Sequence, residues 1–458
     1  MSGAYLVTEV GARPVNQTDV QLTLDALPVR LTGTDALAVL SSSTDEPAFA
    51  WKPGRRVFTM AREGGEVVVT GEAAWQELHV FTEGTHFVRD GIAVAAGHAH
   101  VIASGTARVG AVGSASVEAS EDAHLELRGH AHAYARDRVE TVASEDAWVD
   151  ASDETTTHAS GRVQLTLRGH AFGTAAGETT VRATDSATCL ALDGAMVTID
   201  GTAYLNASGQ VTAIARERAH VNASEDARVI GFGQSKLVVR GSVTVTASDT
   251  CEVHACRDLD APLSVGSPSI TASDHAKVKA QGEGVVVHAH GHAVIEVADQ
   301  AHAIVSGDAS VLVHDGATGV VDDQVRATVR GTGSLRARGH TQVSGFDDGE
   351  IVGTEHASIV ATDHVRLRVA DHVTVRQEGA VHTIADGCVT ITADGEGFVQ
   401  HGAHVTLASI TGNVRVQRLA FARDGRVQSE APGSAGVPSR IHPSTSVPAP
   451  TAVGVAAV

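Results

Sequence analysis

The sequence predicts an all-β protein whose main part is a parallel β-solenoid, and three observations support this fold class. An eight-residue pattern runs from Asp90 to Arg257 through 21 consecutive octads without an insertion. Position 8 is Gly, Asp or Glu in 20 of these octads, and position 6 is Ala in 16. Positions 2 and 4 are mostly Ala, Val or Leu, and no helical segment separates the octads. A fixed period of this kind is typical of repeat architectures, in which each unit stacks on its neighbours.

Each octad predicts one short strand and one corner. Apolar residues at positions 2, 4 and 6 alternate with polar ones, as in a strand that is buried on one face. Gly or an acidic residue then ends the pattern. Because Gly tolerates a positive φ and Asp can hydrogen-bond to nearby backbone, position 8 predicts a turn. Eight residues cannot bury their own apolar face, so we expect successive octads to stack into a solenoid.

The small inward side chains favour a flattened coil of two octads, which is 16 residues. An Ala-Val-Ala set fills little space, so the two facing sheets must lie close together. The alternative is a triangular coil of three octads, or 24 residues, and it would need bulkier residues along its axis. With two octads per coil and strands about 4.8 Å apart, roughly 40 octads predict a rod on the order of 100 Å long.

Three segments follow from where the octad pattern begins and ends. Residues 1–85 lack it and contain Trp51 and Trp75, and they predict a small β-rich N-terminal cap or attachment domain that covers the exposed strand edge of the first coil. Residues 86–418 predict the octapeptide-repeat β-solenoid. Residues 419–458 are rich in Pro, Ser and Ala, with five of the 11 prolines, and predict a disordered tail.

The octad register is interrupted inside the solenoid. The segment that begins at Asp258 contains Pro262 and Pro268, the only prolines between Pro53 and Pro432, and it predicts a bulged corner or a protruding loop. Octads resume at His275, and one extra residue is expected near Gly291.

Composition excludes several classes of protein. A formal net charge of −20 argues against a nucleic-acid partner, because phosphate binding needs clustered cations. The segment from Met1 to Asp19 has no basic start followed by an apolar core, so we expect no secretory signal. No apolar run reaches about 18 residues, which predicts no membrane span. A cytoplasmic or virion-associated location is therefore the expectation. The four cysteines are expected to be reduced.

Paired carboxylates are the signature of glycan-cleaving enzymes. The candidates in this chain lie in two less regular octads, and they are Asp322, Asp323, Asp347, Asp348 and Glu350. Two adjacent Asp residues on a strand point to opposite faces, and no aromatic sugar platform accompanies them in the sequence. We therefore expect no enzyme, and we keep these carboxylates as the candidate site of the alternative.

Histidines and acidic corners are the candidates for metal binding. The run His288, His290 and His292 places imidazoles two residues apart, where they could hold Zn²⁺, Ni²⁺ or Cu²⁺. Acidic pairs such as Glu121-Asp122 and Glu145-Asp146 recur at corners and leave Ca²⁺ as an open alternative to a solvated edge. No Cys or carboxylate completes a fixed ligand set, so we expect no metal and no other cofactor.

The octads resemble the degenerate A-x-V-x-A-x-G/D repeats of octapeptide β-solenoid proteins in bacterial and phage genomes. Examples are SATCLALD from Ser186 and SVTVTASD from Ser242. The period is also similar to that of bacterial ice-nucleation proteins, although the A-G-Y-G-S-T-x-T motif of that family is missing. The resemblance covers roughly residues 90–415. It implies a solenoid architecture and assigns no functional residue.

These features together predict a non-enzymatic structural or adhesive rod, similar to a tail fibre or a surface spacer. The expected partners are a surface glycan or further copies of the chain in a homo-oligomer. One alternative is a glycan-acting β-helix hydrolase or lyase. Another is an ice- or mineral-templating protein, for which the sequence offers the outward pairs Thr244/Thr246 and Thr390/Thr392.

Overall fold

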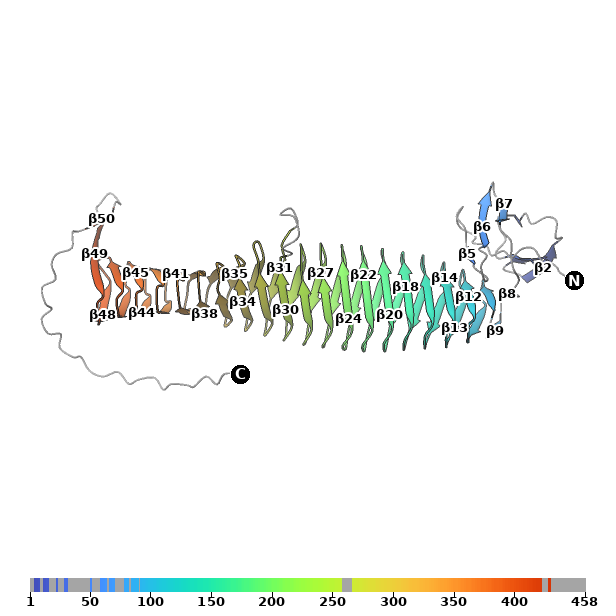
Figure 1. Cartoon of the computed structure of the whole chain (residues 1–458), viewed down its shortest axis with the longest axis horizontal. Coiled ribbons are helices and arrows are strands. Elements are labelled where there is room, and N and C mark those ends of the chain that lie inside the picture. Colours follow the sequence, from blue (N-terminus) through green and yellow to red (C-terminus); the bar gives the residue numbers. More distant parts are fainter. Residues whose placement is uncertain are drawn as a thin grey trace.

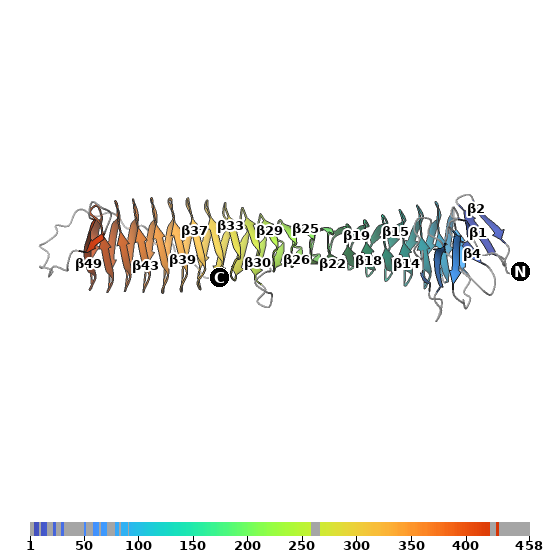
Figure 2. The same cartoon turned by 90° about the horizontal axis from the view of Figure 1, so that it is seen from above.

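A computed structural model of the chain describes residues 84–89, 91–257 and 266–418, together with the strands that lie outside these ranges. Within that part the chain forms β-strands and corners and contains no helix. The strands stack into an elongated, nearly straight rod (Figures 1 and 2). The all-β prediction is confirmed.

Two parallel sheets make up the rod, and the chain alternates between them at every corner. We name them the even sheet and the odd sheet after the numbers of their strands. The even sheet contains β8 (Leu78–Phe81), β10 (Ile92–Ala95), β12 (Arg108–Ala111), β14 (His124–Leu127), β16 (Glu140–Ala143), β18 (Thr156–Ser160), β20 (Phe172–Ala176), β22 (Thr188–Leu192), β24 (Tyr204–Ser208), β26 (His220–Ala223), β28 (Lys236–Val239), β30 (Glu252–Cys256), β32 (Lys277–Gln281), β34 (Val294–Ala298), β36 (Ser310–Val313), β38 (Arg326–Val329), β40 (Gln342–Gly345), β42 (Ser358–Ala361), β44 (Thr374–Glu378), β46 (Thr390–Asp394) and β48 (Thr406–Ile410).

The odd sheet has the same construction on the opposite side of the core. It contains β9 (Thr85–Val88), β11 (His100–Ala103), β13 (Ser116–Ala119), β15 (His132–Ala135), β17 (Trp148–Ala151), β19 (Gln164–Leu167), β21 (Thr180–Ala183), β23 (Met196–Ile199), β25 (Thr212–Ala215), β27 (Arg228–Gly231), β29 (Thr244–Ala247), β31 (Ser269–Ala272), β33 (Val286–Ala289), β35 (His302–Val305), β37 (Thr318–Val321), β39 (Ser334–Ala337), β41 (Glu350–Gly353), β43 (Arg366–Val369), β45 (His382–Ala385), β47 (Phe398–His401) and β49 (Arg415–Phe421).

The register of the sheets decides the size of the coil. In the regular part of the rod each residue pairs with the residue 16 positions further on, as Arg108 does with His124 and Ser116 with His132. One coil is therefore two octads, one in each sheet. The two-sided solenoid is confirmed, and the triangular alternative is wrong.

Alternation along each strand builds the core. Positions 2, 4 and 6 of the octads point inward, and Ala99, Val101 and Ala103 are typical in having 0% of their surface exposed. Glycine at an inward position is compensated by a larger neighbour. A Cβ added to Gly173 would lie 2.6 Å from Cδ1 of Leu167. Volume is thus balanced between the two facing sheets, since Leu167 lies on β19 of the odd sheet and Gly173 on β20 of the even sheet.

Position 8 forms the corner, as predicted. Among the described residues 18 that are not glycine have a positive φ, and all of these except Gln300 are Asp or Glu. The acidic residues take this left-handed conformation at position 8, as Glu121 does with a φ of 63° and Asp137 with 62°. Glycine occupies this region of φ freely and Asp tolerates it better than most residues, whereas Glu bears a steric cost there.

Two departures from the 16-residue register lie in the middle of the rod. Thr244 pairs with Ser269, a separation of 25, so nine additional residues follow β30. The insertion falls on the segment predicted to be a bulged corner or a protruding loop, of which residues 258–265 lie outside the described part. Ser269 then pairs with Val286, a separation of 17. The extra residue belongs to the corner between Gln281 and Val286, so its expected position near Gly291 is wrong.

Strands β1 to β7 precede the solenoid and form two small antiparallel sheets. The bounds are β1 (Ala4–Thr8), β2 (Gly11–Val15), β3 (Leu22–Thr23), β4 (Val29–Leu31), β5 (Ala50–Trp51), β6 (Phe58–Glu63) and β7 (Glu66–Thr70), while β50 (Val427–Ser429) pairs with β49 at the other end. The predicted cap and the predicted tail lie mostly outside the described residues, so both remain predictions.

A candidate binding surface on the odd sheet

Outward side chains form columns along the rod because each coil stacks on the last in register. Positions 3, 5 and 7 of every octad point away from the core, so a side chain has its counterparts directly above and below it. On the odd sheet, Glu118, Tyr134 and Asp150 occupy position 5 of β13, β15 and β17 and lie next to one another. Residues far apart in the sequence therefore meet on the surface.

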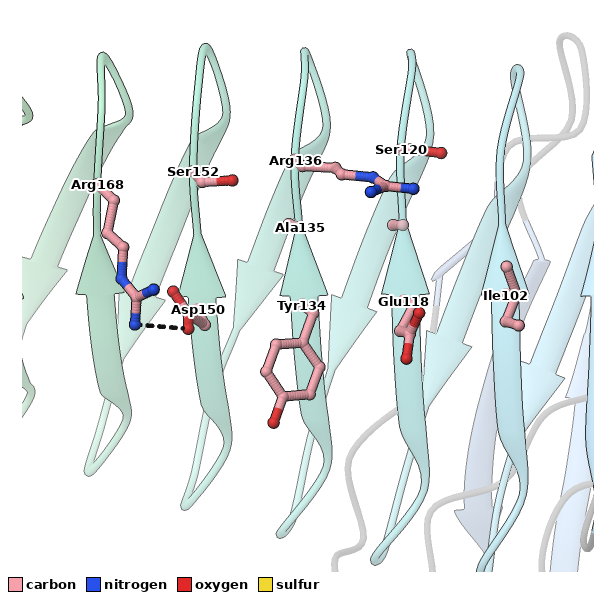
Figure 3. Close-up of a pocket in the computed structure, with 10 residues that line it drawn as sticks. Ile102, Glu118, Ser120, Tyr134, Ala135, Arg136, Asp150, Ser152 and Arg168 are labelled. Atoms are coloured by element: carbon pink, nitrogen blue, oxygen red, sulfur yellow. Dashed lines mark ion pairs between the residues drawn. The ribbon is translucent and has the colours of Figure 1, made fainter.

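A groove of about 260 Å³ lies between the columns at positions 5 and 7 of this sheet. One wall carries Glu118, Tyr134 and Asp150, and the other carries Arg136 and Arg168 (Figure 3). The remaining lining residues are Ile102, Ala119, Ser120, Ala135 and Ser152. The groove spans five strands, from β11 to β19, which is roughly 19 Å at the usual strand spacing.

The charged groups of the groove are only partly paired with one another. Nη2 of Arg168 lies 3.0 Å from Oδ2 of Asp150 (Figure 3). Nε2 of His100 lies 3.6 Å from Oε1 of Glu118 at the groove's edge. Arg136 has no ion-pair partner among the described residues, and its side chain extends along the rod toward Ser120 of the preceding coil (Figure 3). The groove thus presents one guanidinium that is free to bind a ligand.

Aromatic side chains gather beside this groove. The Tyr134 ring packs edge-on against Trp148, with centroids 5.0 Å apart and an interplanar angle of 69°. Trp148 in turn contacts His132 at 5.8 Å. Tyr134 remains 51% exposed. Since only Tyr134, Trp148 and Tyr204 represent Tyr and Trp in residues 86–418, the cluster is a marked local enrichment.

A second groove, of about 360 Å³, occupies the equivalent place on the even sheet. Asn206 and Asn222 line it at position 5, and Arg240 lines it at position 7. The side-chain amide of Asn222 donates a hydrogen bond to the hydroxyl of Tyr204. The third Tyr or Trp of the solenoid thus also lies next to a groove.

The structure does not bring the candidate catalytic carboxylates together. Asp322 and Asp323 lie in the corner between β37 and β38, whereas Asp347 and Asp348 lie in the corner between β40 and β41. The first corner leads from the odd to the even sheet and the second leads back, so they belong to opposite edges of the rod. Glu350 lies at the start of β41.

Asp323 and Asp347 instead accept hydrogen bonds from backbone N–H groups of the preceding coil. Oδ2 of Asp323 accepts the N–H of Gly307 at 3.3 Å, and Oδ2 of Asp347 accepts that of Gly331 at 3.3 Å. A carboxylate that caps an amide of the scaffold is poorly placed to attack or protonate a substrate.

The three candidate metal-binding histidines are exposed but do not converge. His288 lies on β33, His290 just after it, and His292 in the following corner, where its ring packs on His275 at 5.2 Å. Across the described ranges no group of three His, Cys, Asp or Glu side chains is arranged to hold a metal ion.

The acidic corners are occupied by hydrogen bonds and ion pairs. Oε2 of Glu121 accepts the N–H of Gly105 at 2.8 Å, and Asp122 pairs with Arg138 through both carboxylate oxygens, at 2.8 and 2.9 Å. The hydrogen bond from Arg138 lowers the pKa of Asp122. These contacts join residues 16 positions apart, so the acidic corners connect neighbouring coils.

The described cysteines differ in accessibility. Cys189 and Cys251 are buried, and burial raises the pKa of the Cys189 thiol to about 12. Cys388 is exposed. A thiol with so high a pKa carries almost no reactive thiolate at neutral pH, so Cys189 acts as a small apolar core residue.

The fold places the chain in the class of parallel β-solenoid repeat proteins with 16-residue coils. No protein family, curated protein or solved structure matches the chain. Within the part that the structure describes, no helix is long and apolar enough to cross a membrane.

The groove and its aromatic residues were not predicted from the sequence. The signal that could have found them is the rarity of Tyr and Trp in the octads combined with the 16-residue coil. Tyr134 and Trp148 occupy positions 5 and 3 of octads two apart, which places them on neighbouring strands of one sheet.

Proposed function

We propose that the chain is a non-enzymatic structural or adhesive rod, of the tail-fibre or surface-spacer kind. The observation that carries this proposal is the pair of parallel strand ladders that runs from β8 and β9 to β48 and β49. Each coil hydrogen-bonds to the coils before and after it, as the N–H of His124 does to the oxygen of Ala107. Such a ladder makes a stiff, extended body that suits a spacer or a display surface.

The separated carboxylates support the non-enzymatic part of the proposal. An inverting glycosidase holds its two carboxyl groups within about 10 Å of each other and a retaining one closer still. Asp323 and Asp347 are on opposite edges of the rod and both cap backbone amides. The two T-x-T pairs also lie on different sheets, Thr244/Thr246 on β29 and Thr390/Thr392 on β46, and they do not form one continuous face.

The full chain tests the proposal in two assays on the same preparation. Analytical ultracentrifugation measures self-association, and co-sedimentation with bacterial cell envelopes measures adhesion. We expect a defined oligomer or retention on envelopes, without release of new reducing ends from envelope polysaccharides. A monomer that binds no envelope would refute the structural and adhesive role. Release of reducing ends would indicate a glycan-cleaving enzyme, and thermal hysteresis would indicate an ice-binding one.

A further inference from the structure

We propose that the groove lined by Glu118, Tyr134, Asp150, Arg136 and Arg168 binds a neutral linear oligosaccharide that lies along the rod axis. The inference rests on the proposed adhesive role and names its ligand class. It is a binding site only, with no bond made or broken.

The Tyr134 ring provides the stacking surface. Sugar rings have faces of C–H groups that pack on aromatic rings, and an aromatic ring held rigidly loses little freedom on binding. Trp148 holds the Tyr134 ring from one side at 5.0 Å and 69°, while half of the Tyr134 surface remains exposed. The ring is thus both fixed in place and open to a ligand.

Hydrogen-bonding groups of both kinds surround the ring. Arg136 offers guanidinium donors that no described residue occupies, and the carboxylate of Glu118 offers acceptors on the preceding coil. A sugar hydroxyl both donates and accepts, so adjacent hydroxyls match such a set. Ser120 and Ser152 add hydroxyls to the wall that carries Arg136.

The charge of the groove favours a neutral ligand over an acidic one. The formal charges of Glu118, Asp150, Arg136 and Arg168 cancel, and the Asp150–Arg168 pair leaves no excess of positive charge for a polyanion. The chain as a whole carries a formal net charge of −20, which repels acidic polymers.

The direction of the ligand follows from the stacking of coils. The lining residues form two rows parallel to the rod axis, one at position 5 and one at position 7 (Figure 3). The lining residues span roughly 19 Å along the rod axis, which is longer than one sugar ring, so a ligand that contacts them along this span needs more than one ring in line.

Isothermal titration calorimetry on the full chain tests the site. The probes are tetra- to hexasaccharides of the cello-, malto-, xylo- and manno-series, with oligogalacturonate as the acidic counterpart. We expect at least one neutral series to bind. Tyr134→Ala and Arg136→Gln should each weaken that binding by about tenfold or more. Tyr134→Phe, which keeps the ring, should retain most of the affinity.

Matched exposed residues on the same sheet serve as controls. Ile304→Ala removes an exposed apolar side chain at position 5 of β35, and Arg228→Ala removes an exposed arginine on β27, and we expect neither to change affinity. Circular dichroism on each variant checks that the fold is kept.

Three results would overturn the site. They are the absence of binding by every neutral series, equal affinity in wild type and Tyr134→Ala, and binding of oligogalacturonate alone. Because ultracentrifugation and envelope binding are measured separately, a rod that adheres but binds no neutral oligosaccharide would refute this inference and leave the proposed function standing.

Discussion

The acidic side chain at position 8 of an octad stabilises the corner of the preceding coil. The backbone N–H of a position-8 residue points along the rod, and a carboxylate 16 residues later accepts it, as Glu145 does for Gly129 at 2.8 Å. The same contact joins Gly233 to Asp249 at 3.0 Å and Gly339 to Glu355 at 3.0 Å. The restriction of position 8 to Gly, Asp and Glu thus has two causes, a positive φ and an amide that needs an acceptor.

Replacing Glu145 separates these two causes. Glu145→Ala removes the acceptor and keeps the steric cost of a Cβ at a φ of 64°, which Glu145 already bears, whereas Glu145→Gly removes the acceptor and relieves that cost. We expect the free energy of unfolding to fall by about 1–2 kcal/mol for Ala and by less for Gly. In both variants the amide of Gly129 should exchange its hydrogen faster, as measured by hydrogen–deuterium exchange. Glu154→Ala, at position 1 of a neighbouring corner, is the control, and unchanged exchange at Gly129 would contradict the account.

Buried threonines in the core provide a second test at the residue scale. Thr157 is fully buried and its hydroxyl has no hydrogen-bond partner among the described residues, while the hydroxyl of Thr383 donates to Oε1 of Gln377 at 2.5 Å. Thr157→Val should therefore raise the free energy of unfolding by about 1 kcal/mol, and Thr383→Val should lower it by a similar amount or more. Urea unfolding measures the free energy of unfolding of both variants. If the two substitutions change it in the same direction, the hydrogen bonding of the hydroxyl does not determine the change.

Glu126 makes stability depend on pH. Burial raises its pKa, against the opposing effect of Arg128, whose Nη2 lies 2.9 Å from Oε1 of Glu126. A carboxyl whose pKa is higher in the folded state binds more protons there, so this group lowers stability as the pH rises above about 4. Glu126→Gln should therefore stabilise the protein at pH 7, with the gain disappearing below about pH 4. Thermal unfolding at both pH values checks this, and a gain that is equal at both would count against it.

The strand-plus-corner octad is the element that the sequence predicts best. Alternation at Ala99, Val101 and Ala103 defines the inward face, and the small size of that set decides between two and three octads per coil. The prediction of an extra residue near Gly291 is wrong because several glycines in this region are compatible with a corner. Pairing of Ser269 with Val286 puts it instead in the corner that contains Gly282 and Gly284.

The candidate site depends on contacts between elements, and for that reason the sequence predicted less of it. Octad patterning determines that Tyr134 and Trp148 both point outward. Their contact exists only because octads two apart stack in one sheet. The candidate carboxylates Asp323 and Asp347 are three octads apart in the sequence, and the two-octad coil places their corners on opposite edges of the rod.

The nine-residue insertion after β30 is expected to be dispensable. Deleting residues 258–266 restores a separation of 16 between Thr244 and Ser269. We expect the deletion to keep the fold, because regular strand pairing resumes after the insertion and a shorter connection costs less loop-closure entropy. Circular dichroism and thermal unfolding measure the outcome. The control is a deletion of nine residues from a regular part of the rod, such as 210–218. This deletion should disrupt folding because it shifts the octad register by one residue and turns inward side chains outward. Loss of the fold in the first deletion would contradict the expectation.

At the scale of the whole molecule, most interactions are repeated from coil to coil. Ion pairs such as Arg138–Asp122 and Arg162–Asp146 join residues 16 apart, so even the exposed charges connect neighbouring coils. Each exposed pair contributes little to stability by itself. The rod depends mainly on its apolar core and on backbone hydrogen bonds between coils, as is general for solenoids.

Rod length measured by electron microscopy of the purified chain is the most direct test of the two-octad coil. The structure assigns 21 parallel strands to each sheet. At a spacing of about 4.8 Å between neighbouring strands, the rod should be about 100 Å long. With three octads per coil, the same number of octads would form a thicker rod that is only roughly 65 Å long. A slim particle near 100 Å would support the account, whereas a particle near 65 Å or a compact globule would contradict it.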